Sequence, residues 1–133
     1  DIPTKELIEV VAVYSDNKLV PQWLPDGYVS EEPTVSGLDS YMRIEADFYS
    51  ENTDNVNKIY IDYRFLSDDD NKPLYEKDIK EVREYTVHNI SHYIMTNLDN
   101  RVIVWRNGDV EGSIKGDFSL AEAKQIINSI YGE

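Results

Sequence analysis

The last part of the chain, residues 101–133, carries the local signals that most restrict what it can fold into. Asn107-Gly108 separates two stretches with β-branched residues, and this dipeptide favours the type I′ turn of a two-residue β-hairpin. Ser119 and Glu122 have the spacing of a capping box, in which a hydroxyl and a carboxylate bind backbone N–H groups at the start of a helix. The sequence therefore predicts a strand, a tight turn, a second strand and a capped helix.

The predicted final helix has one apolar face, and the strands before it have positions that predict close packing. Four apolar residues recur at the i, i+3, i+4 and i+7 spacing of an amphipathic helix: Ala123, Ile126, Ile127 and Ile130. Gly132 is placed to end this helix. Residues 101–106 are apolar on both sides, which predicts a central strand covered on both faces. Gly112 and Gly116 share one side of the next strand, and we expect the final helix to pack closely there.

The start of the chain is interpreted as a helix followed by an extended segment. Residues 4–14 have apolar groups at helical spacing and are expected to form a short helix. Pro21 and Pro25 exclude a helix in the next segment, because proline favours extended geometry in the residue before it. Trp23 is expected to anchor this segment on the core, and a turn and a strand near 28–34 follow.

Two stretches in the middle alternate regularly between apolar and polar side chains. Residues 41–49 and 58–65 therefore predict two antiparallel strands with one face in water. Residues 80–88 and 90–97 are expected to add two more strands, joined by a turn at residues 88–89, where an asparagine tolerates positive φ.

These elements predict an α+β fold in a single domain over residues 1–133. One curved antiparallel sheet of six to seven strands is expected to pack against the C-terminal helix, with a short N-terminal helix beside it. The expected parts are the first helix and its connection, the sheet, and the final helix, at residues 1–19, 20–118 and 119–131. Cysteine is absent, and a domain of this length needs no disulfide for stability.

Charge is used to choose the register of the hairpin formed by the two alternating stretches. In one register Arg43 lies opposite Asp62 and Asp47 lies opposite Lys58, whereas in the other Arg43 lies opposite Arg64. Like charges directly opposite each other are destabilising, and opposite charges are stabilising. We therefore predict the first register.

The acidic balance of the chain excludes several classes of partner. The chain has 26 acidic and 13 basic residues, so its net charge is 13 − 26 = −13. Such a charge repels nucleic-acid phosphates and anionic lipid surfaces, and it favours a monomer that repels its own copies. No apolar run reaches the length of a transmembrane helix, so membrane contact is expected only through an anchor that precedes Asp1.

The candidate metal ligands are interpreted as structural residues. His88 and His92 are the only histidines, and they lie across a predicted turn without a third soft ligand close in sequence. The acidic run at residues 68–71 has oxygen ligands of the kind that calcium prefers, but not the spacing of an EF-hand, which favours a solvated loop. No metal and no cofactor is predicted.

The sequence favours binding over catalysis. Glu45 and Asp47 are conceivable as a glycosidase pair, but they lie on the predicted wet face, without an apolar pocket to raise a carboxyl pKa. The chain has no glycine-rich phosphate loop and no Gly-x-Ser-x-Gly nucleophile elbow. We therefore expect no enzymatic activity.

A candidate binding surface lies on the same predicted wet face. It consists of Tyr41, Arg43, Tyr49, Tyr60 and Arg64. Tyrosine interleaved with arginine is typical of recognition surfaces. The alternative interpretation, ordinary cross-strand pairing, explains the same residues without a ligand.

Three motifs are shared with a known family: Pro21-x-Trp-Leu-Pro-Asp-Gly-Tyr28, Val102-Ile-Val-Trp105-x-Asn-Gly108, and Gly116-x-x-Ser119-x-x-Glu122 with Asn128-Ser129-Ile130. Over residues 20–131 the chain resembles a bacterial domain of unknown function that is common in Gram-positive anaerobes. That domain follows a single membrane anchor in anti-sigma factors and related proteins. The resemblance implies an extracytoplasmic, membrane-anchored and non-catalytic domain.

The function expected from the sequence is binding or sensing in a membrane-anchored, anti-sigma-like regulator. Its partner would be an unidentified protein or cell-envelope ligand on the tyrosine-rich face. One alternative is a carrier of a lipid or other apolar ligand in a cavity between sheet and helix. A continuous, solid core under residues 120–131 would exclude that carrier. The other alternative is an enzyme of unknown type.

Overall fold

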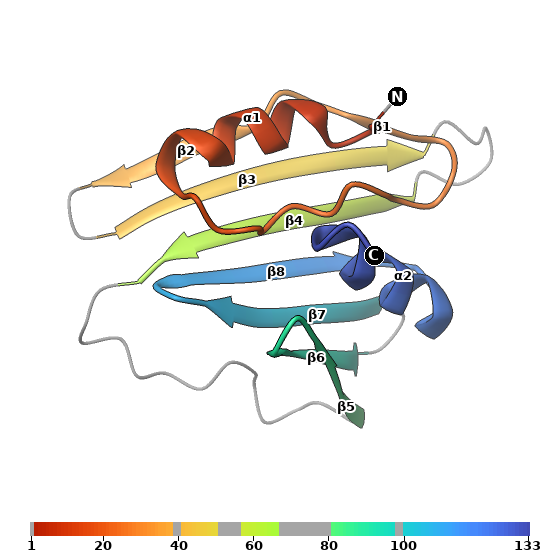
Figure 1. Cartoon of the computed structure of the whole chain (residues 1–133). Helices are drawn as coiled ribbons and strands as arrows, with labels where there is room; N and C mark the ends of the chain where they lie inside the picture. The colour runs from red at the N-terminus through yellow and green to blue at the C-terminus, as the bar shows by residue number, and fades with distance from the viewer. Residues whose placement is uncertain (1, 39–40, 51–56, 67–80, 98–99) are drawn as a thin grey trace.

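The computed structural model describes residues 2–38, 41–50, 57–66, 81–97 and 100–133. Within these ranges, an open antiparallel sheet of eight strands carries two helices on one face (Figure 1). The elements are α1 (Lys5–Tyr14), β1 (Tyr28–Ser30), β2 (Thr34–Leu38), β3 (Tyr41–Ser50), β4 (Lys58–Phe65), β5 (Glu81–Val87), β6 (Ile90–Asn97), β7 (Asn100–Asn107), β8 (Val110–Gly116) and α2 (Leu120–Ile130). The predicted fold class and both predicted helices are confirmed.

The sheet has one strand more than the six to seven predicted. The stretch near 28–34, predicted as one strand, contributes to two strands, because β1 pairs with one half of β3 and β2 pairs with the other half. Pro33 lies between them and has no backbone N–H to donate to a ladder. The edge beside β3 is therefore divided between two short strands.

The order of the strands places the C-terminal part of the chain in the middle of the sheet. Beginning at one edge, the order is β1-β3-β4-β8-β7-β6-β5, and β2 also pairs with β3. β8 therefore lies between its hairpin partner β7 and the distant strand β4. In Figure 1, α1 lies over β3, and α2 lies over β8 and β7.

The two tight hairpins use different turns. His88 and Asn89 both have positive φ, at 58° and 62°, as a type I′ turn requires, so the predicted turn at residues 88–89 is confirmed. In the other hairpin Asn107 pairs with Val110, so the loop residues are Gly108 and Asp109. Only the glycine has positive φ there, at 63°. This matches a type II′ turn, so the hairpin is confirmed and the predicted type I′ turn is wrong.

The register predicted for β3 and β4 is also wrong. Arg43 lies opposite Arg64, which is the arrangement that charge pairing disfavours. The opposite charges meet along diagonals instead. Arg43 Nε lies 3.0 Å from Asp62 Oδ1, and Lys58 Nζ lies 3.0 Å from Asp47 Oδ1. Long side chains span the diagonal between neighbouring strands, so this register keeps the attractive pairs that the prediction required.

Apolar pairing explains why this register is the one formed. On the covered face, Phe48 lies opposite Ile59 and Met42 lies opposite Phe65. A shift of two residues to the predicted register would place Phe48 opposite Asn57 instead. Ion pairs at a sheet surface contribute a few tenths of a kcal/mol to about 1 kcal/mol, whereas burying a large apolar side chain contributes about 1.5–3 kcal/mol. The apolar pairs therefore set the register.

The covered face of the sheet is packed around Trp105, which is fully buried. Its ring lies edge-on to that of Tyr63, with centroids 6.2 Å apart. A Cβ on Gly112, which pairs with Trp105, would lie 2.5 Å from the indole Cζ2. On Gly116 it would lie 2.9 Å from Ile59 Cγ1 and 3.1 Å from Phe118 Cδ2. The close packing predicted at both glycines is therefore confirmed, although these side chains provide it rather than α2.

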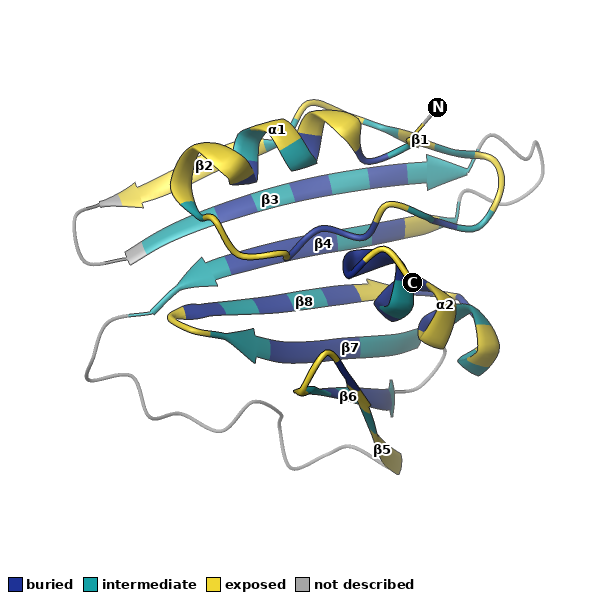
Figure 2. Ribbon diagram, in the orientation of Figure 1, coloured by how far each residue is buried: buried dark blue, intermediate teal, exposed yellow. Residues whose placement is uncertain are grey.

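The final helix begins as predicted. The Ser119 hydroxyl accepts from the Glu122 backbone N–H at 3.0 Å, and the Glu122 carboxylate accepts from the Ser119 N–H at 2.8 Å. All four residues of its predicted apolar face are buried in the core: Ala123, Ile126, Ile127 and Ile130. Figure 2 shows the alternating burial along the strands beneath the helices. The central strand β7 is buried on both faces at residues 103–105, as predicted.

Hydrogen bonds from the core hold the extended segment before β1. The Ser129 hydroxyl accepts from the backbone N–H groups of Gln22 and Trp23, at 3.1 Å and 3.2 Å. The buried Tyr63 hydroxyl donates to the Leu19 carbonyl at 2.7 Å. Trp23 is partly buried and packs against the core, which confirms its anchoring role.

Candidate functional site

The face of the sheet away from the helices, here named the open face, carries the predicted binding residues that the structure describes. Arg43 and Tyr49 lie on β3, and Tyr60 and Arg64 lie on β4. Each alternates with residues whose side chains point into the core, so all four point to the opposite side. The side chain of Tyr41 lies outside the described residues.

Two further strands add charges to the open face that the sequence-based prediction did not include. Glu111 on β8 lies opposite both Arg64 and Arg106. Its carboxylate lies 3.9 Å from Arg64 Nη1 and 3.5 Å from Arg106 Nη2. Glu111 therefore links β4 to β7, which are not neighbours in the chain. The contact between Glu111 and Arg64 depends on the pairing of β4 with β8. In the sequence, the alternation along residues 110–116 places Glu111 on one face of its strand but does not show which strand lies beside it.

Asp62 is the centre of this cluster, and it too was missing from the predicted site. Its exposed fraction is 6%, although it lies on the open face. Burial raises the pKa of Asp62 to about 6; Arg43 and Arg64 act to lower this pKa, and Glu45 and Glu111 act to raise it. One feature of the sequence could have indicated Asp62 as a site residue: it is the only acid in the alternating stretch 58–65.

At the other end of the open face, two tyrosine rings lie next to the ammonium group of Lys58. The Lys58 ammonium lies 5.9 Å from the centroid of the Tyr49 ring and 5.6 Å from that of Tyr60. Asp47 pairs with the same ammonium, and its hydrogen bond raises the pKa of Lys58. Burial raises the pKa of Tyr60, and Asp62 adds to this effect. Four of the five predicted site residues thus belong to one paired array.

A cavity of about 350 Å³ opens beside this aromatic end of the open face. It is lined by Lys58, Tyr60, Asn100, Lys115 and Gly116. These residues come from β4, β7 and β8, and Tyr60 lies directly opposite Lys115. The cavity therefore forms only when the three strands pair.

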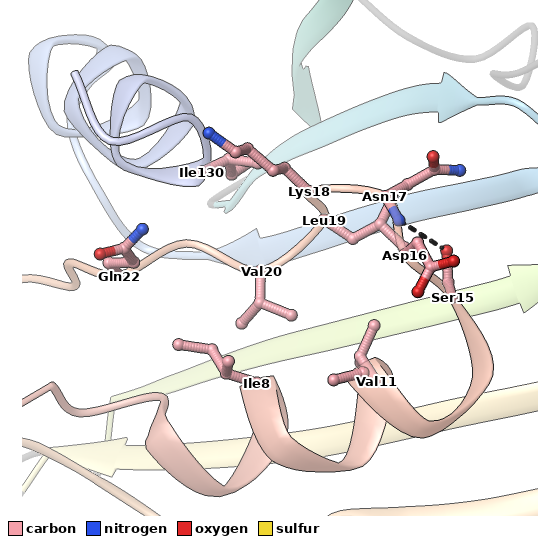
Figure 3. A pocket seen from close by; sticks show the side chains of 11 residues that line it. Ile8, Val11, Ser15, Asp16, Asn17, Lys18, Leu19, Val20, Gln22 and Ile130 are labelled. Atoms are coloured by element: carbon pink, nitrogen blue, oxygen red, sulfur yellow. Dashed lines mark hydrogen bonds between the residues drawn. The ribbon is translucent and has the colours of Figure 1, made fainter.

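A second cavity, of about 340 Å³, lies on the covered face between α1 and residues 15–22, and Ile130 of α2 also lines it. Figure 3 shows Val20 pointing towards Ile8 and Val11 of α1. The carrier alternative predicted a cavity under α2 instead. The apolar face of α2 is buried in the core, and among the described residues α2 contributes only Ile130 to the lining of this cavity.

The comparisons with known proteins identify a family for the chain. A family profile described as a domain of unknown function, DUF4367, matches residues 18–130. The chain belongs to the DUF4367 family. The matched range includes the extended segment, the whole sheet and α2 to its last residue, and α1 precedes it. A search of curated proteins and a search of solved structures each found no match to the chain.

The two histidines of this DUF4367 domain, on β6 and in the turn before it, both contact Tyr131, which follows the last residue of α2. His92 Nδ1 lies 3.1 Å from the Tyr85 carbonyl oxygen, and its Nε2 lies 2.6 Å from the Tyr131 hydroxyl. A carbonyl only accepts, so Nδ1 carries the proton and Nε2 accepts from Tyr131. The ring of His88 stacks on Tyr131, with centroids 5.1 Å apart.

Burial shifts both partners of this hydrogen bond. It lowers the pKa of His92 and raises the pKa of Tyr131 to about 12. Among the described residues, no three His, Cys, Asp or Glu side chains converge as a metal site. The acidic run at residues 68–71 lies outside the described part of the DUF4367 domain. Within that part, no helix combines the length and apolar composition needed to cross a membrane.

Proposed function

We propose that this DUF4367 domain is a non-catalytic binding or sensory module, and that it is the extracytoplasmic part of a membrane-anchored regulator of the anti-sigma type. Its ligand is a protein or a component of the cell envelope. The ligand binds to the open face, around Arg43, Tyr49, Tyr60 and Arg64. Asp62 lies at the centre of this binding surface.

The position of Asp62 is the observation that carries this proposal. A carboxylate with an exposed fraction of 6%, set among arginines, costs folding free energy that an apolar residue would not cost. The main hydrophobic core lies on the covered face, and its packing does not need this group. A buried carboxyl with a strongly raised pKa on an exposed surface is typical of a functional site.

The pairing of the charges favours binding over acid–base catalysis. Arg43 contacts two carboxylates, at 3.3 Å from Glu45 and 3.0 Å from Asp62. A general acid or base needs a carboxyl that can reach the reacting group of a substrate. A prearranged array of tyrosines and ion pairs on rigid strands instead presents a fixed pattern of donors and acceptors to a ligand.

The binding surface can be tested with charge-matched variants of the purified domain. The double variant Arg43→Gln and Arg64→Gln should lower binding to sedimented cell-envelope fragments by about tenfold, because hydrogen bonds to charged groups are lost. The control variant Arg83→Gln and Lys124→Gln removes the same charge from β5 and α2 and should bind like the parent. Absence of binding by the parent, or equal loss in both variants, would contradict the proposal.

The extracytoplasmic location rests on the family resemblance and has its own test. The complete gene product, with an epitope tag inserted into this domain, should lose the tag when protease is added to intact cells. A cytoplasmic protein in the same cells should stay intact until lysis. Protection of the tag in intact cells would contradict the proposed location and leave the binding proposal standing.

A further inference from the structure

We infer that the cavity at the aromatic end of the open face is a binding site for an acidic sugar, a saccharide unit that carries a carboxylate or a phosphate. The inference rests on the proposed function, because the cavity shares Lys58 and Tyr60 with the proposed surface. It adds the chemical class of the ligand, which the proposed function leaves open.

The charge of the lining is the first support. Among the described residues that line it, the charged ones are Lys58 and Lys115 and none is an acid, in a chain with 26 acidic and 13 basic residues. By contrast, Asp16 lines the cavity beside α1, and Glu81 lines a smaller cavity at β5. A cavity lined by two cations in an acidic domain attracts an anion.

The two lysines differ in what they already bind. Lys58 holds Asp47 at 3.0 Å, which fixes its position beside Tyr60. Lys115 is exposed, and within the described residues it has no ion pair. An incoming carboxylate or phosphate therefore pairs first with Lys115, and Lys58 adds a second, positioned charge.

The uncharged lining explains why a sugar fits better than a bare anion. The partly buried ring of Tyr60, whose hydroxyl is hydrogen-bonded to Glu45, offers an apolar surface. Asn100 adds an amide that both donates and accepts hydrogen bonds. An acidic sugar has one anionic group, an apolar C–H face and several hydroxyls, and it matches these three kinds of lining. The volume of about 350 Å³ is in the range of small-molecule sites.

The experiment is calorimetric titration of the whole domain with glucuronate, glucose 6-phosphate, glucose and inorganic phosphate. We expect both acidic sugars to bind at least about tenfold more tightly than glucose or phosphate alone, because only they engage the lysines and the ring together. Lys115→Gln should weaken their binding by about tenfold. Lys124→Gln, the same change at an exposed site on α2, should leave it unchanged. Both lysines are exposed, so these variants should fold like the parent.

Each other outcome overturns a stated part of the inference. Glucose binding as tightly as glucuronate, or Lys115→Gln binding like the parent, would exclude an anion site. Inorganic phosphate binding as tightly as glucose 6-phosphate would exclude the sugar. If acidic sugars fail to bind while Arg43→Gln with Arg64→Gln still loses envelope binding, the inference fails and the proposed function stands. If acidic sugars bind and the parent ignores envelope fragments, the proposed surface fails and the cavity stands.

Discussion

The two faces of the sheet are built from alternate residues of the same strands, yet they use polar groups in different ways. On β4, Ile59, Ile61 and Tyr63 are fully buried beneath the helices, and the single hydroxyl among them donates to a backbone carbonyl. On the other side of this strand, Asp62 and Arg64 belong to an array of ion pairs. The covered face sets the register, and the open face adjusts to it through long side chains.

Each face also contains a buried group whose pKa burial shifts towards neutral or acidic pH. On the covered face, both ring nitrogens of His92 have uncharged partners, the Tyr85 carbonyl and the Tyr131 hydroxyl. On the open face, Asp62 has charged neighbours. Burial disfavours the charged form in both cases, so it lowers the pKa of the histidine and raises that of the carboxyl. The same physical cause therefore gives the two faces opposite responses to pH.

The largest expected difference between the faces lies at two adjacent residues of β8. Ile114 is fully buried, so Ile114→Ala should lower the free energy of unfolding by about 2–5 kcal/mol. Lys115 is exposed on the open face, so Lys115→Ala should change it by less than about 0.5 kcal/mol. Urea unfolding at neutral pH measures both. Equal effects would show that the open face contributes to the core in the way the covered face does.

Gly112 gives a second comparison on the same strand. A Cβ at this position would lie 2.5 Å from Cζ2 of the buried indole of Trp105, so Gly112→Ala should cost about 1–3 kcal/mol through overpacking. The adjacent Ser113→Ala changes the open face and should stay within about 0.5 kcal/mol. Urea unfolding with tryptophan fluorescence as the signal measures both. Unchanged stability of the Gly112 variant would mean that the indole has room to move.

The sequence predicts the elements of this fold well because their signals are local. The capping box of Ser119 and Glu122 involves residues three apart, and the alternation along 41–49 and 58–65 reflects one strand at a time. The prediction of the register was wrong because it considered only charges directly opposite each other, whereas Arg43 contacts Asp62 along a diagonal. The predicted turn type was wrong because Asn107 pairs with Val110 in the strand ladder. The two loop residues are therefore 108–109 rather than 107–108.

The candidate site was predicted only in part, for a related reason. The sequence placed Arg43, Tyr60 and Arg64 on one face, because alternation decides that within a strand. The contribution of Glu111 depends on β8 lying beside β4, which is a pairing of distant segments. Without that pairing, Asp62 has no neighbours on one side, and its burial and raised pKa cannot be foreseen.

Asp62→Asn tests the open face through the pH dependence of stability. The folded carboxyl has a pKa of about 6 against an ordinary value of 3.8, so folding favours its protonated form. The stability contributed by that form is fully present below pH 3.8 and is lost as the pH rises through about 6. From pH 4 to pH 7, the free energy of unfolding of the variant should therefore rise relative to that of the parent by on the order of 1–3 kcal/mol. Urea unfolding measures both. A constant difference would show that the arginines offset burial, and a difference that falls with pH would show that they outweigh it.

His92→Gln tests the covered face and should show the smaller pH-dependent change of the two, because burial shifts the pKa of His92 less than that of Asp62. The folded pKa lies below 6.5, so the unfolded chain binds more protons between these two values. The stability contributed by neutral His92 is fully present above about pH 6.5 and is lost as the pH falls towards the folded pKa.

The parent should therefore lose part of its advantage over the His92 variant between pH 7 and 5, in the opposite direction to the Asp62 comparison. His88→Asn is the matched control, because asparagine tolerates the positive φ of this turn position and the exposed His88 ring is lost from its stack on Tyr131. Urea unfolding across the pH range measures the difference in stability between parent and His92 variant. Its constant part reflects the loss of two hydrogen bonds, and its pH-dependent part reflects protonation of His92. If the difference between parent and variant is constant over this range, or if the His88 variant behaves in the same way, burial of His92 does not control its charge. The contrast between the two faces would then rest on Asp62 alone.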